Sequence, residues 1–326
     1  MRKVCFIVMD MQNVIPNNPK AIKRKKRSLL ADAKRDKLLY LMLAPFLLYY
    51  LIFAYFPMYG IQIAFKDYKP YIGVMGSEWV GMKHFINFFS SPYAWRVIRN
   101  TLMINVYSLA FNFVGTIIMA LLINEVLHKK LRTAIQTVLY MPYFVSTVVV
   151  AGLVISILSP TSGIVNLIIS KFGGEKINFL AIPDYFRTIF VSKLTWQGLG
   201  FGTILYTSAI CSIDESLYEA ASIDGAGRLR KMWNITIPGI KSTIIVQFIL
   251  KMGSMLTVGS ESIILLYQPI TYEKADVISS FVYRYGLENG DYSYAAAVGL
   301  FNSIIALILV VTANKISRKV NQMSLW

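Results

Sequence analysis

The chain has 326 residues, of which 56% are hydrophobic and only 15% are charged, and its formal net charge is +16. A water-soluble protein of this length needs a larger polar surface, so the composition excludes an ordinary soluble globular protein and indicates an integral membrane protein. In that class a positive charge indicates the cytoplasmic ends of membrane helices, which collect Lys and Arg, and not a nucleic-acid-binding surface.

Motifs for redox, metal and nucleotide chemistry are not found. Cys5 and Cys211 are far apart and neither belongs to a C-x-x-C pair, so we expect no disulfide. His84 and His128 are isolated, and we expect no metal site. Without a G-x-x-x-x-G-K-S/T motif or a catalytic acid–base pair, the chain is expected neither to bind ATP as P-loop proteins do nor to be an enzyme by itself.

Residues 1–37 are predicted to be a basic cytoplasmic tail, with five consecutive Lys or Arg residues at 23–27. Two interpretations remain open: a poorly ordered tail, or a segment that lies on anionic lipid headgroups. The apolar run at 4–9 is too short to span a membrane, and no cleavage site of a signal peptide follows it. The remainder, residues 38–326, is predicted to be one transmembrane domain.

Six stretches are long enough to cross the hydrocarbon layer, which takes about 20 apolar residues. They run over about 38–65, 101–127, 133–158, 185–210, 242–267 and 294–314. The fourth is the weakest because it contains Lys193, Trp196 and Gln197. An additional short apolar helix is expected at about 163–170, at the outer surface. The pattern predicts an all-α membrane protein with six transmembrane helices.

The distribution of positive charge predicts the orientation. Lys and Arg concentrate in the tail, in the loop near residues 129–132, in the loop near 228–241 and after residue 314, whereas the opposite loops mix acidic and basic residues. The positive-inside rule therefore places both termini in the cytoplasm.

Polar and aromatic residues within the predicted spans are candidates for a substrate pathway, because such residues are costly in lipid. They are Tyr140, Tyr143, Lys193, Trp196, Gln197, Lys251, Glu261 and Asn302. Sugar rings pack their C–H faces on aromatic rings, and their hydroxyls need amide or hydroxyl partners. The alternatives are that the aromatic residues mark the membrane interface, and that Lys251 or Glu261, on nearly one face of the fifth span, serves helix contacts or the outer interface.

The most informative polar stretch lies at about 213–240, in a predicted cytoplasmic loop. We expect a short helix with a small-residue face to begin at Glu219, a bend at Gly225 and Gly227, where glycine tolerates positive φ, and an end at Pro238. The preceding carboxylates, Asp214 and Glu215, suit a helix N-terminus. A helix–turn–helix of this kind suits docking into a groove on a partner.

This loop resembles the EAA loop of ABC-importer permeases. Glu219, Ala220 and Ala221 are followed by Gly225 after three residues and, after nine more, by Ile235 and Pro238; Asp224 and Ala226 also fit. Ile237 departs from the leucine that is usual there. Further stretches resemble the LplB/YteP type of oligosaccharide permeases within the carbohydrate, or MalF-like, group: Asn100-Thr101, residues 272–278, residues 292–301 and Ser324-Leu325-Trp326.

The resemblance implies a type I ABC-importer permease fold in a bacterial cytoplasmic membrane. It implies one half of an oligosaccharide pathway, a second homologous permease, two ATPase subunits that bind ATP and magnesium, and an extracytoplasmic solute-binding protein. The EAA residues would couple ATPase motion to alternating access. Lys193 and Lys251 hint at an acidic oligosaccharide. The alternatives are a permease for a non-sugar solute and a secondary transporter, for which inverted repeats are not evident.

Overall fold

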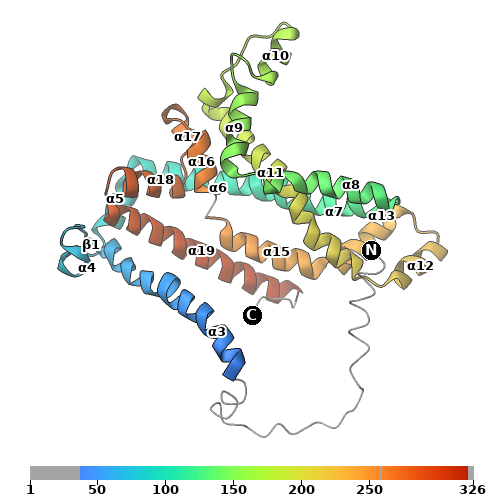
Figure 1. Ribbon diagram of the computed structural model, residues 1–326, viewed down its shortest axis with the longest axis horizontal. Helices are drawn as coiled ribbons and strands as arrows, with labels where there is room; N and C mark the ends of the chain where they lie inside the picture. Colours follow the sequence, from blue (N-terminus) through green and yellow to red (C-terminus); the bar gives the residue numbers. More distant parts are fainter. Residues whose placement is uncertain (1–36, 257–258, 322–326) are drawn as a thin grey trace. The chain divides into compact units, whose positions relative to one another are not determined.

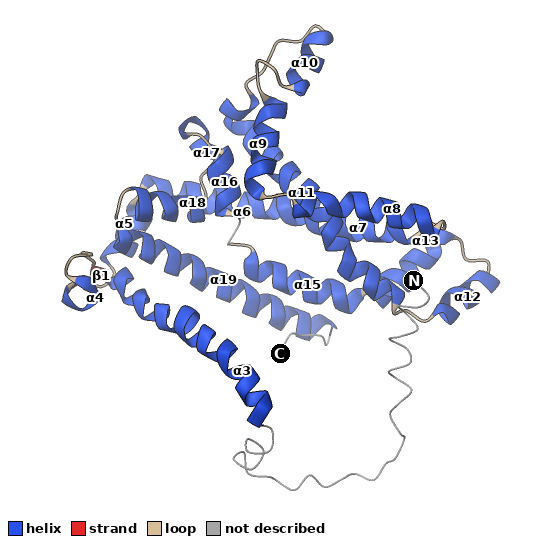
Figure 2. Cartoon of the chain, viewed as in Figure 1, coloured by secondary structure: helices blue, strands red, loops and turns tan. Residues whose placement is uncertain are grey.

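The computed structural model describes residues 37–256 and 259–321. The predicted basic tail falls on residues 1–36 apart from Lys37, and the Ser324-Leu325-Trp326 match follows residue 321, so both lie outside the described residues. Most of the described chain is helical, as predicted (Figure 2). The chain divides into two compact units, Met1–Trp79 and Val80–Trp326.

The described part of the first unit is a helical run followed by a small hairpin. The run, Lys37–Phe65, comprises α3 (Lys37–Tyr50), a π-helical turn η1 (Leu51–Tyr55) and a 3-10 segment η2 (Phe56–Phe65). It matches the first predicted span, and none of its most apolar window is buried. Strand β1 (Lys66–Asp67) pairs antiparallel with β2 (Glu78–Trp79), and α4 (Gly73–Gly76) lies between them in the chain.

The second unit contains all the remaining helices (Figure 1). Its first half comprises α5 (Lys83–Ser90), α6 (Pro92–Ser108), η3 (Leu109–Phe113), α7 (Val114–Asn124), α8 (Lys129–Tyr140), η4 (Met141–Phe144), α9 (Thr147–Leu158), α10 (Ile164–Lys171), η5 (Phe179–Ala181) and α11 (Pro183–Cys211). Its second half comprises α12 (Glu215–Ile223), α13 (Arg228–Lys231), η6 (Met232–Thr236), α14 (Ile237–Gly239), α15 (Lys241–Ser254), α16 (Ser260–Leu266), η7 (Pro269–Thr271), α17 (Tyr272–Ala275), α18 (Ile278–Tyr283), η8 (Arg284–Glu288) and α19 (Tyr292–Asn321).

The number of membrane-spanning helices depends on how bent segments are counted. Within the described residues, three helical runs are long and apolar enough to cross a membrane: Lys37–Phe65, Pro92–Asn124 and Tyr292–Lys319. Two bent helix pairs raise this number to as many as five. The 29-residue α11 matches the fourth predicted span and extends about 44 Å at 1.5 Å per residue, but it is not apolar enough to pass the same test. Length and composition therefore do not confirm a count of six.

The third predicted span is not one straight helix, so that prediction was wrong in shape. Its two halves, Lys129–Phe144 and Thr147–Leu158, meet at an angle of 97°. Pro142 lies in the 3-10 turn η4, and Ser146 begins α9 by accepting a hydrogen bond from the backbone N–H of Val149. A proline cannot donate to the helix ladder, and a capping serine starts a new one, so the chain turns here.

The fifth predicted span is also interrupted. Helix α15 ends at Ser254, and α16 begins only at Ser260, after a glycine at 259. Lys251 and Glu261 therefore lie on two different helices, and the expectation that they share one face of a single helix was wrong. A second bend, of 60°, separates Arg228–Gly239 from α15.

The Asn100-Thr101 pair ties α6 to the segment before α18. The Asn100 amide donates to the carbonyl oxygens of Glu273 and Asp276, at 2.9 Å each. The Thr101 hydroxyl accepts a hydrogen bond from the backbone N–H of Ile278 at 2.9 Å. The Asn100-Thr101 pair and residues 272–278, which are far apart in the sequence, are therefore packed against each other.

Asp276 is the charged residue at the centre of this contact. Its side chain is fully buried and lies 3.2 Å from Arg96 and 2.6 Å from Arg284. The Ser280 hydroxyl donates to its other oxygen at 2.9 Å. Removing one partner of a buried ion pair is strongly destabilising, so this cluster fixes how α17 and α18 pack on α6.

Candidate functional site

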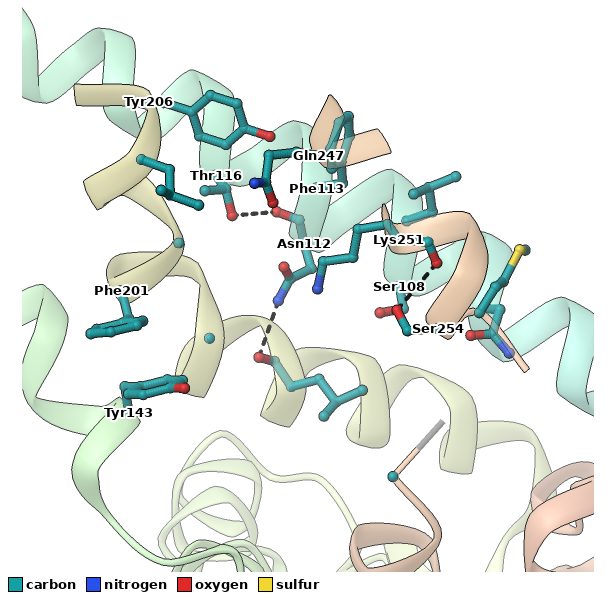
Figure 3. Close-up of a pocket in the computed structure, with 18 residues that line it drawn as sticks. Ser108, Asn112, Phe113, Thr116, Tyr143, Phe201, Tyr206, Gln247, Lys251 and Ser254 are labelled. Atoms are coloured by element: carbon teal, nitrogen blue, oxygen red, sulfur yellow. Dashed lines mark hydrogen bonds between the residues drawn. The ribbon is translucent and has the colours of Figure 1, made fainter. Parts of the chain in front are cut away.

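A cavity of 470 Å³ lies between α6, η3, α7, α11 and α15, with η4 at its edge (Figure 3). Its polar lining comes mainly from α6, η3, α7 and α15: Asn105, Ser108, Asn112, Thr116, Gln247, Lys251 and Ser254. Its aromatic lining is Phe113, Tyr143, Phe201 and Tyr206. A mostly apolar cavity with a few polar groups is typical of small-molecule sites in helical proteins.

Glycine residues on α11 allow this cavity to have polar walls. A side chain at Gly198 would contact the Asn112 amide, and one at Gly202 would press on Thr116. The Asn112 amide donates to the carbonyl oxygen of Leu194 at 3.3 Å, and Thr116 donates to the Asn112 carbonyl at 2.6 Å. Small residues at helix contacts let the helices approach closely, and here they leave the Asn112 amide at the cavity wall.

Lys251 supplies the positive charge of the cavity. In Figure 3 its side chain extends from α15 toward Asn112. Over the part of the chain that the structure describes, its ammonium group has neither a carboxylate within ion-pair distance nor a hydrogen-bond acceptor. An unpaired cation in a membrane helix is costly, and such residues mark substrate or ion pathways.

Tyr143 and Phe201 form a stacked aromatic pair on the wall of the cavity (Figure 3). Their ring centroids are 4.0 Å apart and their planes differ by 4°. Tyr143 comes from the 3-10 turn at the 97° bend, so the bend that the sequence analysis missed is what presents this ring. A stacked aromatic pair is a rigid surface for the C–H face of a sugar.

The structure brings only two of the eight pathway candidates, Tyr143 and Lys251, to this cavity. Trp196 lines a different cavity. Tyr140 and Glu261 line neither of these two.

Three other candidates hold the fold together. The buried Lys193 donates to the Ser262 hydroxyl at 2.8 Å and links α11 to α16. Gln197 donates to the carbonyl of Val145 at the bend between η4 and α9. Asn302 donates to the carbonyl of Leu256 at the interruption between α15 and α16. Helix interruptions free backbone carbonyls, and in a membrane these need internal donors.

Most polar groups of the cavity were missed by sequence analysis. Asn105, Ser108, Asn112 and Thr116 recur every three or four residues, which places them on one helix face. This periodicity within the second predicted span was a usable signal. The sequence signal for Gln247 was weaker, because it is a single polar residue one helical turn before Lys251.

The predicted coupling loop is a helix–turn–helix in the structure, as expected. Its first helix, α12, begins earlier than predicted, at Glu215, so Glu219 lies within the helix and not at its start. The reason is that Asp214 caps the helix by accepting a hydrogen bond from the backbone N–H of Ser216 at 2.9 Å. This hydrogen bond lowers the pKa of Asp214, because the ionised carboxylate is the form that accepts it most strongly.

The turn after α12 depends on Gly225, whose φ is +72°. The backbone N–H of Ala226 bonds the carbonyl of Ala221 at 2.8 Å, and that of Gly225 bonds the carbonyl of Ser222 at 3.1 Å. This pair of bonds is a Schellman motif, which needs a left-handed residue at the glycine position. The predicted bend is therefore present at Gly225, whereas Gly227 has a negative φ of −68° and is the N-cap residue that precedes α13.

The second arm of the loop runs one residue past Pro238 and ends at Gly239. The expected stop at Pro238 was thus wrong by one residue. A π-helical turn, Met232–Thr236, precedes the proline and changes the hydrogen-bond register. The Tyr218 hydroxyl lies 2.9 Å from that of Thr236, which ties the two arms together.

In the predicted coupling loop Glu219 and Ala220 are exposed and Ala221 is half-buried, and several apolar side chains are exposed as well. No residue of α12 is buried. Ala221, Asp224, Ala226 and Ile235 surround a small cavity of 290 Å³ between the two arms, together with Arg230, Lys231 and Asn234. Ile223, Leu229 and Trp233 are 73–88% exposed. Such exposed apolar residues on a loop with internal hydrogen bonds are typical of a protein–protein contact.

Apolar helices around a cavity that polar and aromatic side chains line, with an exposed helix–turn–helix in the same chain, are the arrangement expected of a membrane permease. Residues 112–322 match the family model of the binding-protein-dependent transport system inner membrane component, and the chain belongs to this family.

Two curated proteins of Bacillus subtilis strain 168 are similar over nearly the whole chain. One is the polygalacturonan/rhamnogalacturonan transport system permease protein YteP, 44% identical over 93% of this chain and 95% of its own. The other is the protein LplB, 46% identical over 92% of this chain and 94% of its own.

Solved structures agree with this assignment. A chain of a bacterial ABC transporter involved in import of the acidic polysaccharide alginate superposes with a TM-score of 0.84 and 46% identity, over 90% of this chain and 99% of that one. A chain of the bacterial alginate transporter in complex with a periplasmic protein that holds an alginate pentasaccharide gives a TM-score of 0.85 and 45% identity, over 92% and 100%. The predicted ABC-importer permease fold is confirmed.

Proposed function

We propose that this chain forms one half of the translocation pathway of an ATP-driven importer for oligosaccharides that carry carboxylate groups. The observation that carries this proposal is the unpaired Lys251 ammonium in the cavity beside the stacked Tyr143 and Phe201 rings. A cation, an aromatic surface and several amides together match a uronic acid, which has a carboxylate, a C–H face and hydroxyl groups. The acidic polysaccharides in the names of YteP and of the alginate transporter support the same substrate class.

The proposal assigns different tasks to this chain and to its partner subunits. A second permease completes the pathway, a solute-binding protein delivers the sugar, and two ATPase subunits bind ATP and magnesium. The helix–turn–helix of residues 214–239 is the surface that receives ATPase motion, with Glu219, Ala220 and Ala221 on α12 and Gly225 at its turn. Its exposed apolar residues support this role. The permease converts the two states of the ATPase into inward- and outward-facing cavities.

The Lys251→Gln variant tests the substrate class. We expect uptake of a labelled trigalacturonate to fall at least about tenfold, since a charge-assisted hydrogen bond contributes about 1.5–3 kcal/mol. Uptake of an uncharged oligosaccharide of similar length, where the transporter accepts one, should change little. Lys315→Gln, at an exposed position on α19, removes the same charge away from the cavity and should behave as the parent. Unchanged uronide uptake in Lys251→Gln would remove the basis for an acidic substrate.

A further inference from the structure

A second cavity, of 790 Å³, lies on another side of α6 and α11. The two cavities share no lining residue. On α6, Asn105 faces the first cavity and Tyr107 the second, and residues two apart on an α-helix point about 200° apart. A sugar in the first cavity therefore does not extend into the second, and the second needs its own explanation.

The second cavity carries an excess positive charge. Asp184 pairs with Lys274 at 3.0 Å, which neutralises both. Arg187 donates through Nη2 to the Asn100 side-chain oxygen at 2.7 Å, which holds the guanidinium at the cavity wall. Within residues 37–256 and 259–321, Arg187 has no carboxylate at ion-pair distance, and its Nε has no hydrogen-bond partner. A guanidinium in this state is suited to an anion with several oxygens, such as a phosphate.

Polarity changes along the length of this cavity. Arg187 lies about 6 Å along the axis from the start of α11 at Pro183, and Trp196 lies about 20 Å along it. The charged residues gather at the end near Pro183, whereas the part farther along α11 is lined by Phe111, Val191 and Trp196 together with the hydroxyl groups of Ser192 and Thr195. Phe111 and Trp196 are 62% and 53% exposed. A ligand with an anionic end and a long apolar body matches this arrangement better than a sugar, which is polar throughout.

We propose that this cavity binds one anionic phospholipid, with its phosphate on Arg187 and an acyl chain along Phe111, Val191 and Trp196. Arg187 lies one turn from the end of a helix about 44 Å long, which is the depth of a lipid headgroup relative to a hydrocarbon layer of about 30 Å. An arginine guanidinium binds phosphate oxygens through several N–H groups at once, which suits the headgroup of a phospholipid in either leaflet. The proposal is independent of the transported substrate, because the lipid occupies a different cavity.

The test measures thermal stability of the detergent-purified transporter with added phosphatidylglycerol or phosphatidylcholine. We expect phosphatidylglycerol to raise the unfolding temperature by about 5 °C or more over phosphatidylcholine. Arg187→Gln should lose most of this difference, and Arg187→Lys should keep part of it. Arg99→Gln, which removes an exposed charge close by but outside the cavity, is the matched control and should keep it.

Because Arg187→Gln also disturbs the contact with Asn100, a second variant leaves that contact intact. Thr188→Trp fills the cavity and should abolish the preference for phosphatidylglycerol while leaving stability without lipid unchanged. The proposal is overturned if both variants keep the full preference. It is also overturned if galacturonate oligomers reproduce the stabilisation with the same dependence on Arg187, or if Trp196→Cys crosslinks to a second permease in native membranes.

Discussion

At the residue scale, single hydrogen-bonding groups and single glycines determine the geometry of the cavity that Lys251 lines and of the predicted coupling loop. Lys251 defines the charge of the cavity, and Asn112 reaches its wall only because α11 has glycines opposite. Gln197 and Asn302 resemble binding residues in the sequence, yet each donates to a carbonyl at a helix interruption. A polar residue in a membrane helix has two common tasks, ligand contact and backbone satisfaction, and only coordinates distinguish them.

The turn of the coupling loop gives a prediction for one residue. Gly225→Ser should destabilise the turn by about 1 kcal/mol, because a left-handed conformation is unfavourable for a residue with a Cβ. Amide exchange of the segment 214–231 should then become roughly fivefold faster, measured by hydrogen–deuterium exchange. Gly227→Ser is the matched control, since Gly227 has a negative φ at the start of α13 and serine is a favourable N-cap. Equal exchange in the two variants would show that the Schellman turn is not needed.

At the element scale, close helix contacts and helix interruptions shape the cavity. Gly200 on α11 lies against the backbone of α8, and a Cβ there would overlap the carbonyl oxygen of Leu139. The bend between η4 and α9 then presents Tyr143 to the cavity. The same small-residue contact and the same bend thus fix the stacked Tyr143–Phe201 pair.

Gly200→Ala tests the contact between α8 and α11. The added methyl meets backbone, which cannot move as a side chain can, so we expect a loss of about 2 kcal/mol or more. The unfolding temperature in detergent should fall by about 4–8 °C. Gly152→Ala, on α9, meets nothing within 4 Å and should leave it nearly unchanged. If both variants melt like the parent, α8 is not packed on α11 as closely as the structure has it.

At the scale of the whole molecule, much of the apolar surface is left for lipid and partners. The run Lys37–Phe65 buries none of its most apolar window within this chain, and the coupling loop exposes Ile223, Leu229 and Trp233. Contiguous exposed apolar surface of this kind marks membrane contact or association with other proteins. The chain is therefore expected to work only within an assembly.

Co-purification of the tagged chain in mild detergent tests the assembly. We expect a second permease and an ATPase to accompany it. Glu219→Lys, which reverses a charge on the exposed surface of α12, should leave membrane insertion intact but reduce stimulated ATPase activity at least about tenfold, because like charges at an interface cost several kcal/mol. Lys315→Gln should retain the partners and the activity. A chain that purifies alone would favour a self-contained transporter instead.

The sequence by itself determined the class of the protein and the position of its loop. Apolar length, the asymmetry of positive charge and the spacing from Glu219 to Pro238 are local properties, and a membrane helix satisfies its own backbone bonds, so they could be read without a fold. The tertiary structure decided which polar residues meet. Lys193 and Lys251 look alike in the sequence, but one is buried against Ser262 and the other lines the cavity. The difference arises because the interruptions near Val145 and Leu256 redirect the helices, and these interruptions are held by side chains 52 and 46 positions away in the sequence, Gln197 and Asn302.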